Sequence, residues 1–89
     1  MSYEETVEEK LSRLTGAPRI AFLNKWKRWL LDLLPPHVDP AAIYGFPLDK
    51  LEHVEELLKE HCTGLTESEC YIEFVKYTKG YTVRAITMG

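Results

Sequence analysis

The sequence predicts an α+β fold, in which three main helices and a short helical turn at 40–44 precede a C-terminal β-hairpin. Through residues 3–62, apolar side chains recur every three or four positions, which is typical of amphipathic helices. From residue 70 onward, β-branched and aromatic residues dominate, which is typical of strands. The 89 residues suffice for one small domain, so we expect residues 1–89 to form a single globular unit.

The first predicted helix spans residues 3–15. Ser2 and Glu5 have the spacing of a capping box, in which each side chain satisfies a backbone amide of the other residue. The apolar stripe of this helix consists of Tyr3, Val7, Leu11 and Leu14. Gly16 suits the left-handed position that commonly ends a helix, so we place the end at Thr15.

The second predicted helix, residues 18–34, is the centre of the domain. Pro18 suits the first helical position, and Pro35 disfavours helical geometry at the residue before it. More than half of the circumference is apolar, so we expect this helix to contact two neighbours. One of its apolar stripes consists of Phe22, Trp26, Trp29 and Leu33.

A proline-rich segment separates the second helix from the third. Asp39 and Pro40 have the character of an N-cap followed by the first residue of a helical turn, which Gly45 ends. The third main helix is predicted over residues 47–62 and stops at Thr63-Gly64. Its apolar side consists of Leu48, Leu51, Val54, Leu57 and Leu58.

The predicted hairpin has strands at 70–77 and 81–87, with Lys79-Gly80 at a tight turn. A hairpin without a third strand leaves backbone amides and carbonyls unpaired at its edges, and such edges can pair with a strand of another chain. The residues of this candidate strand-edge interface are Ile72, Phe74, Tyr81 and Val83.

The formal net charge is −3, which disfavours nucleic acid as the main partner. Charge also alternates between elements: residues 1–10 carry −3, residues 18–34 carry +3 and residues 47–62 carry −3. We therefore expect the basic second helix to pack between two acidic ones and to pair with them.

No apolar run approaches the ~20 residues that span a bilayer, so no membrane insertion is expected. The acidic N-terminal segment does not resemble a signal peptide. Two cysteines, Cys62 and Cys70, are too few for a disulfide framework of the secreted kind. We therefore expect a cytoplasmic protein.

The aromatic and basic side of the second helix is the main candidate site. Its proposed partner-binding residues are Phe22, Lys25, Trp26, Trp29 and Leu33. Tryptophan is enriched at interaction hot spots and can stack on nucleobases, but a domain this small also needs large core residues. Core packing, a protein-binding surface and base stacking all remain open.

Other chemistry has weaker support in the sequence. His61, Cys62 and Cys70 lie close enough along the chain to suggest a metal site, but the spacing of a zinc site is missing. A buried thiol at Cys62 explains this cysteine more simply. There is no phosphate-binding glycine loop and no acid–base or nucleophile pair, so we expect no enzyme, no catalytic residues and no cofactor.

Two functions fit these observations. We favour a small non-catalytic protein-interaction or regulatory protein that offers an apolar helix face or a strand edge to a protein partner, including a second copy of itself. The alternative is a nucleic-acid-binding regulator, because the element order is similar to that of a winged helix-turn-helix domain. A gap of 12 residues between the second and third main helices, and the acidic third helix, disfavour that alternative.

Overall fold

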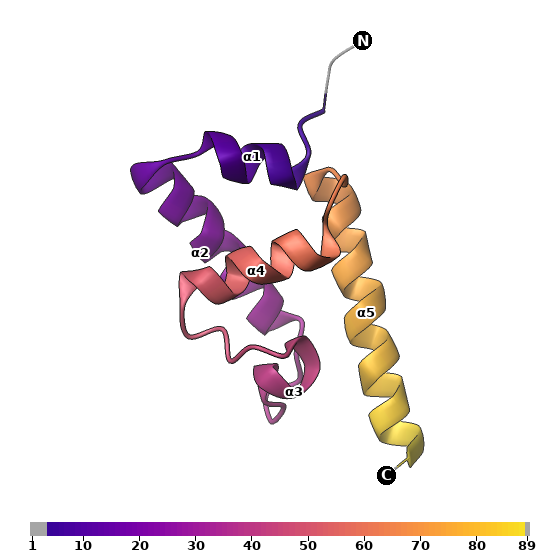
Figure 1. Cartoon of the computed structure of the whole chain (residues 1–89). Helices are drawn as coiled ribbons and strands as arrows, with labels where there is room; N and C mark the ends of the chain where they lie inside the picture. The colour runs from indigo at the N-terminus through magenta and orange to yellow at the C-terminus, as the bar shows by residue number, and fades with distance from the viewer. Residues whose placement is uncertain (1–3, 89) are drawn as a thin grey trace.

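A computed structural model describes the backbone of residues 4–88 and the side chains of residues 4–80. The described chain contains five helices: α1 (Val7–Arg13), α2 (Gly16–Asp32), α3 (Pro40–Tyr44), α4 (Leu51–His61) and α5 (Glu67–Met88). In Figure 1, α4 crosses α2, and α5 runs along one side from the end near α1 to the C-terminus. No strand occurs in these residues; their one β-type contact is an isolated bridge between Thr6 and Thr66.

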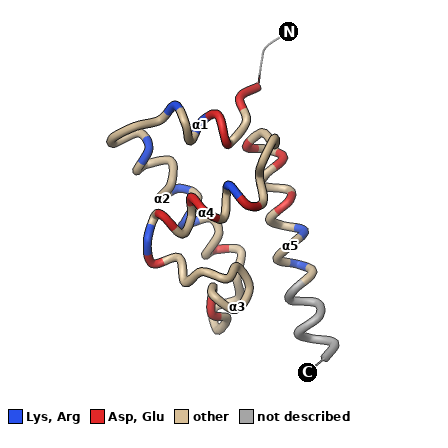
Figure 2. Tube along the Cα trace, viewed as in Figure 1, with Lys and Arg blue, Asp and Glu red and all other residues tan. Residues whose placement is uncertain are grey.

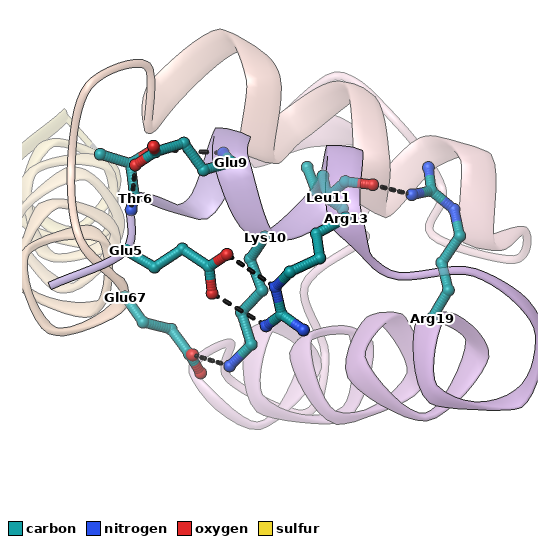
Figure 3. A network of polar contacts seen from close by, with 8 residues as sticks. All are labelled: Glu5, Thr6, Glu9, Lys10, Leu11, Arg13, Arg19 and Glu67. Carbon is teal, nitrogen blue, oxygen red and sulfur yellow. Dashed lines mark hydrogen bonds and ion pairs between the residues drawn. The ribbon is translucent and has the colours of Figure 1, made fainter.

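Helix α1 begins later than the sequence suggested, at Val7 instead of Tyr3. Its capping box is formed by Thr6 and Glu9: the Glu9 amide donates to the Thr6 hydroxyl at 3.1 Å, and the Thr6 amide donates to the Glu9 carboxylate at 3.0 Å (Figure 3). The predicted cap residue Ser2 lies outside the described residues. The sequence contains both capping spacings, and the later one starts the helix.

The junction of α1 and α2 depends on Gly16, which has a φ of 64°. The left-handed conformation is as predicted, but Gly16 is the first residue of α2 and not the residue that follows α1. Arg19 then links three helices: its guanidinium donates to the Leu11 carbonyl at the end of α1 (Figure 3) and to the Glu55 carboxylate of α4. The expected pairing of the second and third main helices is therefore present.

The short helix α3 agrees with the sequence in detail. The Asp39 carboxylate accepts from the Ala41 amide at 3.1 Å, and Gly45 ends the helix with a φ of 83°. Leu48 was expected in the third main helix, but α4 begins only at Leu51. Leu48 lies in the loop before α4, fully buried, with a φ of 58°. Burial of this leucine outweighs the cost of its left-handed backbone, of about 1 kcal/mol.

The largest correction concerns the C-terminal region, where helix α5 replaces both strands of the predicted hairpin. Thr66 and Glu69 form a second capping box, with the Thr66 amide donating to Glu69 at 2.9 Å. The buried residues Cys70, Phe74 and Thr78 recur every four positions, which is the spacing of a helix face. The strand preference of these residue types is weak and depends on a sheet neighbour, which this chain does not provide in its described part. The α+β class is therefore wrong, and the fold is all-helical.

The core is one cluster centred on Trp26, Leu30, Val54, Leu57 and Phe74, each of which is fully buried. These residues come from α2, α4 and α5, so α5 closes the side of the core that α4 leaves open. Helix α4 contacts α1, α2 and α5. Helix α4 therefore holds α1, α2 and α5 together.

Cys62 and Cys70 form a disulfide with a Cα–Cα distance of 5.4 Å. Cys62 caps the end of α4, and Cys70 lies in the first turns of α5, so the bond bridges the α4–α5 junction. Both cysteines are fully buried. The burial of Cys62 agrees with the sequence, but its sulfur is bonded and is not a free thiol.

Acidic residues gather on α1 and α4, and basic residues recur along α2 (Figure 2). No helix in the described part of the chain has the length and apolarity needed to cross a membrane.

Candidate functional site

The structure separates the five predicted partner-binding residues into two groups. Trp26 has no exposed surface and Phe22 is 6% exposed, so both belong to the core. Trp29 and Leu33 are half-buried and pack against that core. Lys25 is exposed. Only the last three therefore reach the surface.

The two tryptophans belong to an aromatic cluster between α2 and α5. Tyr71 stacks on Trp26 with ring centroids 4.3 Å apart, and its ring lies edge-on to Trp29 at 4.5 Å. Phe74 adds a third α5 contact, 6.0 Å from Trp26. Because ring pairs in these geometries each contribute about 0.5–1.5 kcal/mol beyond burial, the cluster is a main attachment of α5 to α2.

A charge network lies beside these rings. The Glu67 carboxylate accepts from Lys10 at 3.0 Å (Figure 3) and from Lys25 at 3.2 Å, so one side chain of α5 links α1 and α2. The Tyr71 hydroxyl also donates to Glu67, at 3.4 Å. Burial acts to raise the pKa of Glu67, but the hydrogen bonds from both lysines outweigh it and hold the pKa below its ordinary value. Glu67 is therefore a carboxylate at neutral pH.

The exposed side of α2 carries a shallow depression of ≈ 640 Å³. We call this surface the α2 outer face; the depression is lined by Ala21, Asn24, Lys25, Arg28, Trp29, Leu31 and Asp32. Leu31 is 36% exposed, and Ile20, about three turns earlier on the same side of α2 but outside the depression, is 52% exposed. The face therefore combines cationic side chains with apolar surface that no described residue covers.

The cations of this face differ in how they are used. Lys25 is paired with Glu67, as described above. Lys27 and Arg28 form no ion pair with any described residue. Asp32 is the one acidic residue that lines the depression. Arg28, which is exposed and lines the depression, and Lys27, which is half-buried beside it, are therefore available to meet an external anionic group.

The predicted strand edge does not exist, because its four residues lie in α5. Phe74 is fully buried, and Ile72 is 55% exposed on the opposite side of the helix. The side chains of Tyr81 and Val83 lie outside the described residues. Since helical backbone groups are paired within the helix, no strand of another chain can add here.

His53, His61 and both cysteines are used in packing. Among residues 4–80, no three His, Cys, Asp or Glu side chains converge as metal ligands. Cys62 and Cys70 are joined to each other, while His61 packs against the rings of Phe74 and Tyr77 at 5.3 and 5.0 Å. His53 lies 3.1 Å from Asp49 and stacks on a neighbouring ring.

Sequence reasoning missed Glu67 and Tyr71, the two α5 residues that contact the α2 outer face. A signal for them was present: the Thr66–Glu69 capping spacing marks a helix start immediately before the Cys70–Phe74 repeat. Once this segment is helical, Glu67 and Tyr71 lie on one side of it, four positions apart.

The chain matches no known protein family, no curated protein and no solved structure.

Proposed function

We propose that this is a non-catalytic protein-interaction or regulatory protein, and that its α2 outer face binds an acidic amphipathic helix of a protein partner. The observation that carries the proposal is exposed apolar surface at Leu31 and Ile20 on the same side of α2 as Lys27 and Arg28, which form no ion pair with a described residue. Of these four residues, Leu31 and Arg28 line the depression. A partner helix with leucine-type anchors and flanking carboxylates complements both features.

Nucleic acid is a poorer occupant of this face. Its phosphates would meet Asp32 and the Glu67 carboxylate, and Lys25 is already neutralised by Glu67. The chain as a whole carries −3. The winged-helix alternative also needs a hairpin wing, and α5 occupies that part of the chain. No second function is therefore proposed.

A second copy of the chain is a weaker occupant than a different protein. Its best acidic helix face is on α4, where Glu52, Glu56 and Glu60 are exposed at four-residue spacing. That face presents no exposed apolar side chain, so it offers charge without an anchor for Leu31. The same argument predicts that any self-association is weak.

We place the protein in the cytoplasm as part of this proposal. The chain has two cysteines, whereas small secreted domains that rely on disulfides have many more. Detection of the protein in the soluble cytoplasmic fraction of gently lysed cells would support this location, and exclusive recovery outside the cytoplasm would contradict it.

A binding titration tests the proposed face. The probe is a fluorescein-labelled synthetic helix of about 16 residues, with leucines at helical spacing and glutamates between them; a second probe carries lysines in place of the glutamates. We expect fluorescence anisotropy to report binding of the acidic probe only. Reversing two charges in Lys27→Glu/Arg28→Glu should weaken binding about tenfold or more.

The matched control is Lys50→Glu, which reverses an exposed charge in the loop before α4. It should leave binding of the acidic probe unchanged. The proposal fails if neither probe binds, if the control weakens binding as much as the double variant, or if mixed duplex DNA binds more tightly than the acidic probe. A stable dimer in sedimentation would instead assign the face to a second copy.

A further inference from the structure

We propose that the Cys62–Cys70 disulfide is a redox-sensitive clamp, which holds the first turns of α5 against α2 when oxidised and releases them when reduced. The consequence for partner binding rests on the function proposed above, whereas the clamp itself concerns only this chain. The inference combines the place of the bond, the contacts of the residues around Cys70 and the chemistry of disulfides.

The bond spans the one connection between α4 and α5. Cys62 is the C-cap residue of α4, and Cys70 is the fourth residue of α5. The loop between the two helices includes Gly64, which has a φ of 76° and is exposed. The disulfide therefore closes a short loop whose tip faces solvent.

Cys70 lies between the two residues that contact the α2 outer face. Tyr71, the next residue, places its ring 4.5 Å from that of Trp29. Glu67, three residues earlier, binds Lys25 at 3.2 Å. Opening of the helix at Cys70 would therefore weaken the contact of Tyr71 with Trp29 and the ion pair of Glu67 with Lys25. Trp29 and Lys25 both line the depression on α2.

Apart from the ring contacts of Tyr71 with Trp26 and Trp29, the other attachments of this turn are polar and partly solvated. The Val7 amide donates to the Leu65 carbonyl at 2.9 Å, and Lys10 pairs with Glu67 at 3.0 Å with its side chain 32% exposed. Solvated ion pairs contribute little to stability. By contrast, closing a loop of this length with a disulfide changes the ratio of closed to open states by about 50- to 100-fold.

The chemistry needs a dithiol reductant. Its thiolate attacks one sulfur of the bond and forms a mixed disulfide, while the other protein sulfur leaves as a thiolate. The second thiol of the reductant then displaces the remaining cysteine. Two electrons reach the protein, both cysteines take up protons to become thiols, and the reductant becomes a disulfide. Because Cys62 and Cys70 are fully buried, attack requires the loop to open first. In the cytoplasm, where disulfides are usually transient, such a bond is suited to respond to redox conditions.

Thiol counting and hydrogen exchange test the clamp without any partner. Alkylation of the denatured, air-oxidised protein should find no free thiol, and two after treatment with dithiothreitol. On reduction, amide protection at Cys70 and Tyr71 should fall about 50- to 100-fold, while protection in the middle of α4, at Leu57 and Leu58, should change much less. The double variant Cys62→Ala/Cys70→Ala should resemble the reduced protein with or without dithiothreitol.

Three results would overturn the clamp. Two free thiols in the oxidised protein would show that the bond does not form. Equal loss of protection in α4 and α5 would show that the bond only raises global stability. Unchanged protection at Tyr71 would show that the turn is held without it. Repeating the titration with the acidic helical probe separates the two proposals. If reduction releases α5 but the probe does not bind, the proposed function is wrong and the clamp still stands.

Discussion

Replacing Gly80 with alanine should stabilise the protein, because Gly80 lies inside α5 without a positive φ. A methyl group at this position would meet no described heavy atom within 4 Å outside the neighbouring helix backbone. Alanine is favoured over glycine in a helix interior by about 0.8–1.0 kcal/mol, largely through the lower entropy of the unfolded chain. For a domain of this size, 1 kcal/mol shifts Tm by about 4–8 °C.

The sign of the change distinguishes a helix from a hairpin. In a tight turn at Lys79-Gly80 the glycine would need a positive φ, and alanine would then cost about 1 kcal/mol. Urea unfolding followed by circular dichroism at 222 nm measures the difference directly. Gly64→Ala is the matched control, because its φ of 76° predicts destabilisation by about 1 kcal/mol. Loss of stability in Gly80→Ala would refute a continuous α5.

The remaining predictions concern the core and the charge network. Trp26→Ala should cost about 3–5 kcal/mol and leave the protein largely unfolded by circular dichroism, since Trp26 is fully buried; a folded, stable variant would place this ring on the surface. Tyr44→Phe should cost about 1–2 kcal/mol in urea unfolding, because the buried hydroxyl donates to the Leu30 carbonyl at 2.9 Å, and an unchanged midpoint would contradict that bond. Because its lysine partners lower the pKa of Glu67, its carboxylate stabilises the fold above the ordinary value of 4.5, and this contribution disappears as the pH falls through the lowered pKa. Glu67→Gln should therefore lose about 1 kcal/mol at pH 7 and less at pH 3; an equal loss at both pH values would exclude the ion pairs as the cause.

Local signals in the sequence were sufficient for the helices of the first two-thirds of the chain. Asp39, Pro40 and Gly45 bound α3 as predicted, because caps and glycine turns act over a few neighbouring residues and need no tertiary partner. The start of the first helix was predicted wrongly, since α1 begins at Val7. Ser2–Glu5 and Thr6–Glu9 have the same spacing, and local chemistry alone does not choose between them.

The C-terminal region shows where local signals mislead. Tyrosine, isoleucine, valine and threonine favour strands only when a pleated neighbour packs against them, and here the available neighbour is the aromatic surface of α2. The stacking of Tyr71 on Trp26 and the tilted contact of Phe74 with the same ring favour the helix, and the Thr66–Glu69 cap starts it. The burial of these side chains against α2 therefore outweighs their intrinsic preference for strands.

Short-range patterns in the sequence predicted that helices occupy the chain up to residue 62, with turns at Gly45 and Gly64, and that the basic α2 pairs with the acidic α4. Which side of α2 is buried depends instead on packing between helices that are distant in the sequence. An apolar arc wider than one neighbour can cover does not reveal which rings will be covered. Packing of α5 placed Trp26 in the core and left Trp29 at its edge, and it brought Cys70 to Cys62. Contacts between distant segments depend on the whole arrangement of helices, which periodicity along one segment does not encode.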